Sequence, residues 1–176
     1  IEEGNTGRKG KGGFYRLSRD NGKKVKEARD LSSGEYHKAN RRASFPSAKM
    51  GKRGLSALMD CDDDGARFVT DVLLDTLAYA AYIVPDVSDD IYSIDGAMKV
   101  GYNWKKGPFE MMDSIGVPSM VKRLQETGRE VPKFLSQAQE KGSFYNVEDG
   151  EIMRLCSSGE MVVVERPEET LNVADL

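Results

Sequence analysis

Histidine and cysteine are scarce in this chain of 176 residues, which has one His and two Cys. The cysteines, Cys61 and Cys156, stand alone, so the sequence excludes a disulfide-dense scaffold and favours a reducing, cytoplasmic setting. The single histidine, His37, has no acid–base partner implied by the sequence, which argues against a histidine-based catalytic site. Long apolar runs are also missing, so no membrane-spanning helix is expected.

A secretory leader and an initiator methionine are absent as well. The chain opens IEEGNTGRKGKGG, which is charged and glycine-rich rather than apolar. Hydrophobic residues make up 39% of the composition, below the usual share of a globular domain, so part of the chain is expected to lie outside a core. We therefore interpret the sequence as a fragment of a longer polypeptide.

Charge divides the chain into two unlike parts. Residues 1–54 hold 15 Lys and Arg against 6 Asp and Glu, whereas the remaining 122 residues hold 11 against 23. Residues 36–60 are basic and lack sustained periodicity, which predicts a connector. An alternative is a nucleic-acid- or anion-binding module that uses the basic N-terminal third. Because that third has few aromatic residues and no recognition motif, we favour a solvated connector.

A glycine-rich run and an acidic run each imitate a ligand site. GRKGKGG at residues 7–13 matches neither the dinucleotide fingerprint nor the P-loop spacing. The run DCDDD at residues 60–64, with Gly65 and Asp71, imitates an EF-hand calcium loop. Arg67 stands where that loop is usually apolar, so we favour acidic N-capping of a helix and expect no metal site.

A long helix is predicted after residue 60, and shorter helices follow it. Apolar residues surround most of the wheel of the long helix, which predicts burial on most faces. Ser88 is expected to cap the next helix. The remaining helices are expected to start at a proline and end at a glycine: Pro108 to Gly116, Pro118 to Gly128 and Pro132 to Gly142. Phe109, Met112 and Ile115 share one face, which predicts a packing corner, and Asp113 is expected to bind a neighbouring backbone N–H.

The end of the chain has a strand pattern, and part of it occurs twice. SFYNV, the turn EDG and EIMRLC predict a hairpin, and MVVVE predicts a further strand. Lys-Gly-x-Phe-Tyr followed by a polar turn occurs at residues 10–26 and again at 140–154. A domain-sized internal repeat explains this, and a chance likeness of two hairpins is the alternative. The expected domains are a hairpin tail of a preceding copy (1–35), the basic connector (36–60) and a complete helical unit with a terminal hairpin (61–176).

Residues 89–117 carry a specific series of motifs. They contain Ile-Asp-Gly-Ala-Met at 94–98, Gly-Pro-Phe-Glu at 107–110, then Asp113 and Gly116. In order and spacing this run resembles the C-terminal domain of 3-hydroxyacyl-CoA dehydrogenases, and the glycine-Phe-Tyr hairpins resemble the end of that domain. The resemblance implies a mainly α, 6-phosphogluconate-dehydrogenase C-terminal-like helical bundle with small β-hairpin appendages.

The resemblance also implies where the chemistry lies. In that family a Rossmann domain binds NAD and a His–Glu pair takes the substrate proton. Neither is found in this sequence, so the fragment is expected to hold no catalytic residue, cofactor or metal, with NAD bound by the parent. An Asn of the first copy contacts substrate in the family, and the matching position here is Asp71. We therefore take Asp71 and Asn103 as the substrate-facing candidates.

The expected function is structural. Tandem copies are typical of multifunctional fatty-acid β-oxidation enzymes, some of which are fused to an enoyl-CoA hydratase, and the ending VVVERPEETLNVADL resembles the approach to such a domain. We expect an inactive domain-assembly fragment of an NAD-dependent oxidoreductase of lipid metabolism whose parent oxidises (3S)-hydroxyacyl-CoA. Its expected partners are other domains of the same polypeptide, and a further hypothesis is a homodimer through a helical face. No membrane partner is expected.

Overall fold

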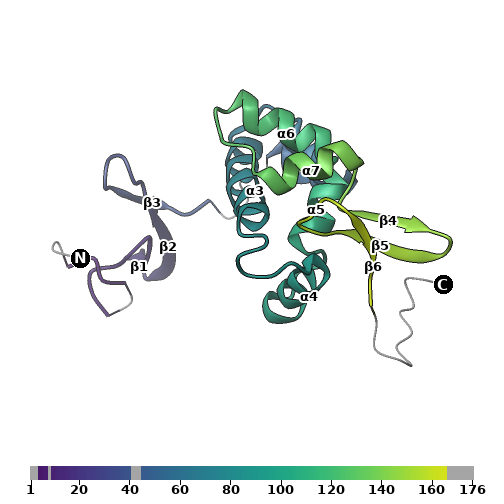
Figure 1. Cartoon of the computed structure of the whole chain (residues 1–176). Helices are drawn as coiled ribbons and strands as arrows, with labels where there is room; N and C mark the ends of the chain where they lie inside the picture. The colour runs from purple at the N-terminus through teal and green to yellow at the C-terminus, as the bar shows by residue number, and fades with distance from the viewer. Residues whose placement is uncertain (1–3, 8, 41–44, 166–176) are drawn as a thin grey trace. The chain divides into compact units, whose positions relative to one another are not determined.

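The computed structural model of the chain describes residues 4–7, 9–40 and 45–165 (Figure 1). The chain forms two compact units, Ile1–Ser44 and Phe45–Leu176. The larger unit is mainly helical, and each unit carries one small antiparallel sheet. The mainly α class with small β appendages is thus confirmed, whereas the domain borders expected from the sequence stay predictions.

The smaller unit is built around a three-stranded sheet. Its strands, in antiparallel chain order, are β1 (Tyr15–Asp20), β2 (Lys23–Arg29) and β3 (Tyr36–Lys38). Asn21 and Gly22 form the turn between β1 and β2 with φ of 48° and 79°, as expected for a two-residue Asn-Gly hairpin loop. Among the described residues of this unit no hydrophobic side chain is buried. The first sheet therefore has no core of its own.

Helices make up the body of the larger unit. In chain order they are α1 (Pro46–Met50), η1 (Gly51–Arg53), α2 (Leu55–Met59), α3 (Asp64–Tyr82), α4 (Ile91–Tyr102), α5 (Pro108–Ile115), α6 (Val117–Glu126) and α7 (Lys133–Lys141). The segments α1, η1 and α2 fall within the predicted connector, and Met59 at the end of α2 is buried in the core. None of the described helices combines the length and the hydrophobicity needed to cross a bilayer.

The predicted helix ends fit α5 and α7 but not α4. Helix α5 starts at Pro108, and α7 runs from Pro132 as N-cap to Gly142 as C-cap, where φ is 93°. The prediction that Ser88 caps α4 is wrong. The N-cap is Asp90, whose carboxylate accepts from Tyr92 N at 3.1 Å, while the Ser88 hydroxyl accepts from Asp90 N at 3.1 Å. The aspartate lies next to the first helical residue and so reaches the free amides first.

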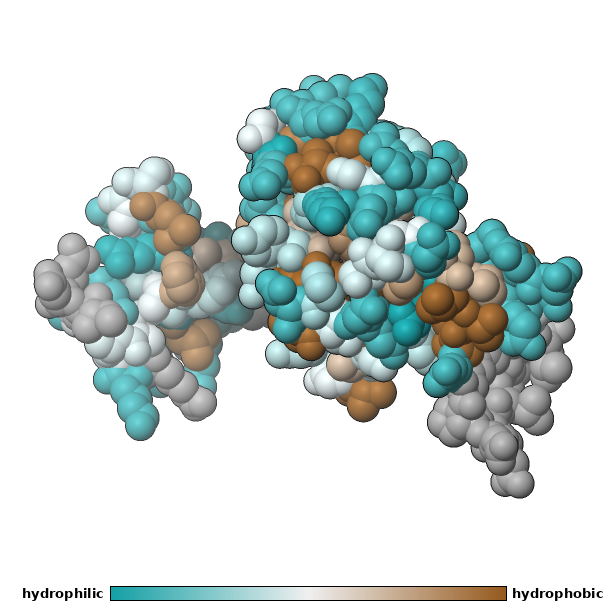
Figure 2. Space-filling view, viewed as in Figure 1, coloured by the Kyte–Doolittle hydropathy of each residue, from teal (hydrophilic) through white to brown (hydrophobic). Residues whose placement is uncertain are grey.

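Helix α3 has the predicted start but not the predicted burial. Asp63 is its N-cap and accepts from Ala66 N at 2.9 Å, which confirms acidic capping. The expected burial on most faces is wrong, because only the side that packs against the neighbouring helices, chiefly α5 and α7, is covered. Large side chains remain exposed along the helix at Phe68, Val72, Tyr79 and Tyr82. Figure 2 shows brown, hydrophobic areas scattered among hydrophilic ones on the visible face of the molecule.

Three phenylalanines form the centre of the core. Phe109 on α5 packs edge-on against Phe134 and Phe144, with ring centroids 5.9 Å and 5.1 Å away. Phe144 immediately precedes the second sheet, whose strands are β4 (Tyr145–Glu148), β5 (Glu151–Leu155) and β6 (Met161–Val163). The predicted hairpin and further strand are confirmed. The Phe144 ring thus packs this sheet against the helices. Figure 1 shows the strands β4–β6 next to α5.

Candidate functional site

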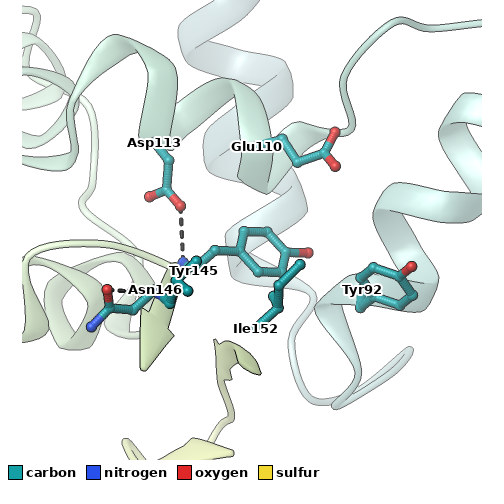
Figure 3. Close-up of a pocket in the computed structure, with 7 residues that line it drawn as sticks. Tyr92, Glu110, Asp113, Tyr145, Asn146 and Ile152 are labelled. Atoms are coloured by element: carbon teal, nitrogen blue, oxygen red, sulfur yellow. Dashed lines mark hydrogen bonds between the residues drawn. The ribbon is translucent and has the colours of Figure 1, made fainter. Parts of the chain in front are cut away.

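Asp113 on α5 lies against the start of the second sheet. Its carboxylate oxygens accept hydrogen bonds from the backbone N–H groups of Phe144, at 2.8 Å, and Tyr145, at 2.9 Å. Figure 3 shows the Asp113 carboxylate directed at the amide of Tyr145. The prediction that Asp113 binds a neighbouring backbone amide is confirmed.

Asp95 on α4 is fully buried and joins three segments. One of its oxygens accepts from Phe109 N at 2.9 Å. The other accepts from Glu110 N at 3.1 Å and from the Tyr145 hydroxyl at 2.9 Å. The two amides lie in the first turn of α5, where N–H groups lack intrahelical acceptors and the helix dipole favours a negative charge. We call the following group the carboxylate clamp: Asp95, Asp113, Phe144 and Tyr145.

The residue before α5 has to be glycine for the clamp to form. A Cβ atom at Gly107 would overlap the Asp95 carboxylate. Glu110 completes this helix start, because it accepts from Gly107 N at 2.8 Å and from Lys99 Nζ at 2.7 Å. The Gly-Pro pair therefore opens space for a buried acid and then begins the helix that binds it.

Burial governs the pKa of the clamp groups. Desolvation raises the pKa of Asp95 from 3.8 to about 6, although the hydrogen bonds it accepts act in the opposite direction. Burial also raises the pKa of Asp113. The pKa of Tyr145 is raised by burial and by the neighbouring Asp95 charge, so its hydroxyl stays protonated and remains a donor.

A cavity of about 320 Å³ lies beside the clamp. Its walls come from α4, α5 and the β4–β5 hairpin, and include Tyr92, Glu110, Asp113, Tyr145, Asn146 and Ile152. The ring of Tyr145 extends between Glu110 and Ile152 (Figure 3). The cavity is thus bounded by the same hairpin that the clamp holds in place.

The carboxylates around this cavity are occupied by donors of the protein itself. Asp113 binds two backbone amides, and Glu110 binds an amide and a lysine. Tyr145 donates its hydroxyl proton to Asp95. A general base or a nucleophile needs an atom that can meet the substrate. The geometry therefore fits the fixing of helix ends to a hairpin better than acid–base catalysis.

The structure places the two substrate-facing candidates outside the cavity walls. Asp71 lies on the exposed side of α3 and forms an ion pair with Arg129 at 3.0 Å, next to Asp75, which binds the same guanidinium at 2.7 Å. Asn103 is the C-cap of α4 in a left-handed conformation with φ of 56°. Their contact with a substrate stays a prediction.

Two basic side chains of the smaller unit, Arg16 and Lys26, have partners within that unit. Arg16 pairs with Glu27 at 2.6 Å and lies over the ring of Tyr36, 4.0 Å from its centroid. Lys26 lies 4.1 Å from the ring centroid of Tyr15. These contacts neutralise or cover part of the positive charge on which an anion-binding function would depend.

Asp95 is the functional residue that sequence reasoning missed. It follows Ile94 and lies one turn after Ile91, which is also buried. A charged residue at such a position needs a partner inside the protein. Gly107 before Pro108 was a second signal, because it leaves space for the Asp95 carboxylate. The contact between Asp95 and Gly107 is visible only in the three-dimensional structure.

Comparison with known proteins gives relatives for most of the chain. No protein-family model and no solved structure matches it. A protein of Bacillus subtilis provisionally named a 3-hydroxyacyl-CoA dehydrogenase is 34% identical over 158 residues, which are 86% of this chain and 20% of the relative. A Rickettsia felis protein provisionally named a fatty acid oxidation complex trifunctional enzyme is 36% identical over 142 residues, 79% of this chain and 19% of the relative.

A Rickettsia prowazekii protein, also provisionally named a fatty acid oxidation complex trifunctional enzyme, is 34% identical over 143 residues, which are 19% of its length. The chain thus spans about a fifth of the curated relatives that it matches over most of its own length. Its sequence corresponds to one segment of these larger proteins. The chain therefore resembles, over most of its own length, one segment of proteins named as 3-hydroxyacyl-CoA dehydrogenases or as fatty acid oxidation complex trifunctional enzymes.

Proposed function

We propose that the chain is the non-catalytic, domain-assembling segment of an NAD-dependent 3-hydroxyacyl-CoA dehydrogenase that acts in fatty-acid β-oxidation. The carboxylate clamp is the observation that carries this proposal. Its buried acids bind backbone amides and a tyrosine of the same segment, which is the chemistry of a rigid scaffold. The relatives, which are about five times longer than the matched region, support a role within a larger polypeptide.

The finer fold proposed for the larger unit is the C-terminal helical bundle of the 6-phosphogluconate-dehydrogenase type. Helices α3, α5, α6 and α7 contact one another around the phenylalanine cluster, and the terminal sheet closes one end. Residues before 45 would belong to the end of a preceding copy of this bundle. This assignment extends the sequence resemblance from a family to an arrangement of two copies in tandem.

NAD does not fit the described residues of this chain. A dinucleotide site uses a glycine-rich turn that leads from a strand directly into a helix N-terminus. Here the glycine-rich residues 7–13 lead into the antiparallel strands β1 and β2 instead. We assign NAD binding and hydride transfer to a Rossmann domain elsewhere in the parent polypeptide, which would act in the cytoplasm. An enoyl-CoA hydratase domain is the second proposed neighbour, and the acyl-CoA substrate binds the parent.

A dehydrogenase assay on two proteins tests the proposal. The parent polypeptide and the 176-residue chain are each given NAD and a (3S)-hydroxyacyl-CoA, and NADH formation is followed by absorbance. We expect turnover by the parent and none by the chain, and we expect no NAD binding by the chain in calorimetry. Turnover by the chain alone would overturn the structural role, and an inactive parent would overturn the assigned reaction.

A further inference from the structure

The two sheets are built in the same way, although they lie in different units. Each has three antiparallel strands in chain order. Each first turn has two residues with positive φ, Asn21 and Gly22 in one and Asp149 and Gly150 in the other. The sheets differ in strand length, since β1 and β2 are longer than β4 and β5. The shared geometry makes position-by-position comparison meaningful.

The Phe-Tyr motif occupies the same place in both ladders. The carbonyl of Phe14 accepts from Arg29 N at 2.9 Å, and the carbonyl of Phe144 accepts from Leu155 N at 2.8 Å. The tyrosine that follows is the first residue of its strand. Tyr15 pairs with Ala28, and Tyr145 pairs with Arg154. In antiparallel pairing the amide of this tyrosine points away from the partner strand. In the second sheet that outward amide donates to Asp113.

The second turn of each sheet also matches. Both contain the tetrapeptide Ser-Ser-Gly-Glu, at residues 32–35 and 157–160. The glycines have φ of 79° and 88°. The two turns are closed by corresponding backbone bonds, from Asp30 N to Glu35 O at 2.8 Å and from Cys156 N to Glu160 O at 2.9 Å, although the first turn is one residue longer. The likeness therefore extends through all three strands.

The two motifs have opposite surroundings. Phe144 is 0% exposed and packs against two other phenylalanine rings, whereas Phe14 is 71% exposed. Tyr145 is partly buried and donates to Asp95, whereas Tyr15 is 58% exposed. A three-stranded sheet without a buried face is marginal in water. The first sheet carries the docking residues of the second sheet without the helices that receive them.

We propose that the first sheet is a docking element for a second helical body with the same acceptor chemistry: two buried carboxylates at a helix corner beside an aromatic pocket. This inference rests on the proposed function, because the body is assigned to a part of the parent polypeptide outside these 176 residues. Phe14 fills the aromatic pocket. The amide of Tyr15 donates to one carboxylate and its hydroxyl donates to the other.

The helical body described here cannot be that acceptor. Its two carboxylates already bind Phe144 and Tyr145, and its pocket is filled by the Phe144 ring. The parent has room for another body, because the region matched in the relatives is about a fifth of their length.

One difference defines the acceptor further. Leu155, which is fully buried, corresponds to Arg29 in the first sheet. The Arg29 Nε donates to the Gly34 carbonyl at 3.0 Å, so the guanidinium lies against the turn between β2 and β3. The acceptor therefore needs a polar rim at this point, where the described body has a closed apolar core.

Hydrogen exchange in the parent polypeptide and in this chain tests the proposal. We expect the peptide that contains Tyr15 to exchange at least about tenfold more slowly in the parent, because docking closes its amide off from water. Phe14→Ala should abolish that protection in the parent. Leu17→Ala is the matched control, because Leu17 corresponds to Val147, which stays 66% exposed in the docked sheet. In this variant the Tyr15 peptide should stay protected in the parent.

Each result has one meaning. Equal exchange in parent and chain, or equal effects of the two substitutions, overturns the docking proposal. Protection that rises with the concentration of the 176-residue chain also overturns it, since a second copy would then be the partner. Dehydrogenase activity of the same parent preparation is measured in parallel. An active parent with an unprotected Tyr15 peptide refutes only the docking, whereas an inactive parent with a protected peptide refutes only the reaction.

Discussion

Two sheets of one topology end up in different states in this chain. The second sheet, β4–β6, has Phe144 inside the phenylalanine cluster and its first two amides on Asp113. The first sheet, β1–β3, presents Phe14 and Tyr15 to solvent. Their turns, strand order and ladder positions agree, so local sequence explains the shape of both. Only the second sheet has a helical acceptor in this chain. Burial of the Phe-Tyr motif therefore depends on tertiary contacts and not on the local sequence.

The largest expected effect separates the two phenylalanines. In this chain Phe144→Ala should lower the free energy of unfolding by about 3–5 kcal/mol, because it empties the centre of the core. Phe14→Ala should change it by no more than about 0.5 kcal/mol. Urea unfolding followed by circular dichroism measures both. Similar losses for the two variants would mean that the first motif is already buried in this chain.

Asp95→Asn comes next, because the amide group cannot accept all the bonds that the carboxylate accepts. Its NH₂ group would face donors at Glu110 and Tyr145, and we expect a loss of about 2–4 kcal/mol in urea unfolding. Asp20→Asn, on the exposed end of β1, is the control and should stay within about 0.5 kcal/mol. A neutral Asp95→Asn would show that the clamp does not hold the second sheet.

Two carboxylates, Asp95 in the larger unit and Asp30 in the smaller one, should respond to pH in opposite directions. The pKa of Asp95 is raised from 3.8 to about 6, so the folded larger unit binds more protons than the unfolded chain in this range. Its contribution to stability is present below pH 4 and is lost as pH rises through about 6, at about 1.4 kcal/mol for each pKa unit. Asp95→Asn should remove this contribution and leave that of Asp113, whose pKa is also raised by burial.

In the first sheet the pKa of Asp30 is lowered, chiefly by the Ser32 hydroxyl and the Ser33 amide. Its contribution is present at neutral pH and is lost as pH falls through its ordinary titration range. Hydrogen exchange resolved by peptide, measured from neutral pH to pH 4, follows both regions. Parallel slopes in the two regions would contradict the expected contrast.

The smallest expected effect concerns the tyrosine hydroxyls. Tyr145→Phe removes one donor from the buried Asp95 and should cost about 1–2 kcal/mol. Tyr15→Phe should be neutral in this chain, because the Tyr15 side chain is mostly exposed. Urea unfolding distinguishes the two if both variants keep the native circular dichroism spectrum. A cost for Tyr15→Phe equal to that for Tyr145→Phe would indicate an acceptor within the chain.

Local signals predicted the larger elements of the fold. Prolines at the starts and glycines at the ends predicted the limits of α5 and α7. The strand pattern after residue 142 predicted the terminal sheet. The short helices α1 and α2 were not predicted, because helices of five residues have no room for a repeating apolar pattern. The exposure of Phe68 and Tyr79 on α3 was also missed, since a helical wheel shows which residues are apolar but not which partners are present.

The candidate site could be predicted only in part. Asp113 was expected to bind an amide, but its partners lie 31 and 32 residues downstream, beyond any local rule. The role of Asp95 depends on the approach of α4 to the start of α5, which the sequence does not reveal without a pairing rule for buried carboxylates. The roles of Asp71 and Asn103 were inferred from the family resemblance rather than from local residue patterns. Their contact with a substrate stays a prediction.

The spacing of the bonds to Asp95 sets an order of assembly during synthesis. Its amide partners on α5 follow it by 14 and 15 residues, whereas its tyrosine partner follows by 50. The nascent chain can therefore join α4 to α5 while the hairpin is still unmade. The hairpin, which is synthesised later, then closes on helices that are already joined, and a product that stops before β4 leaves Asp95 without its tyrosine donor.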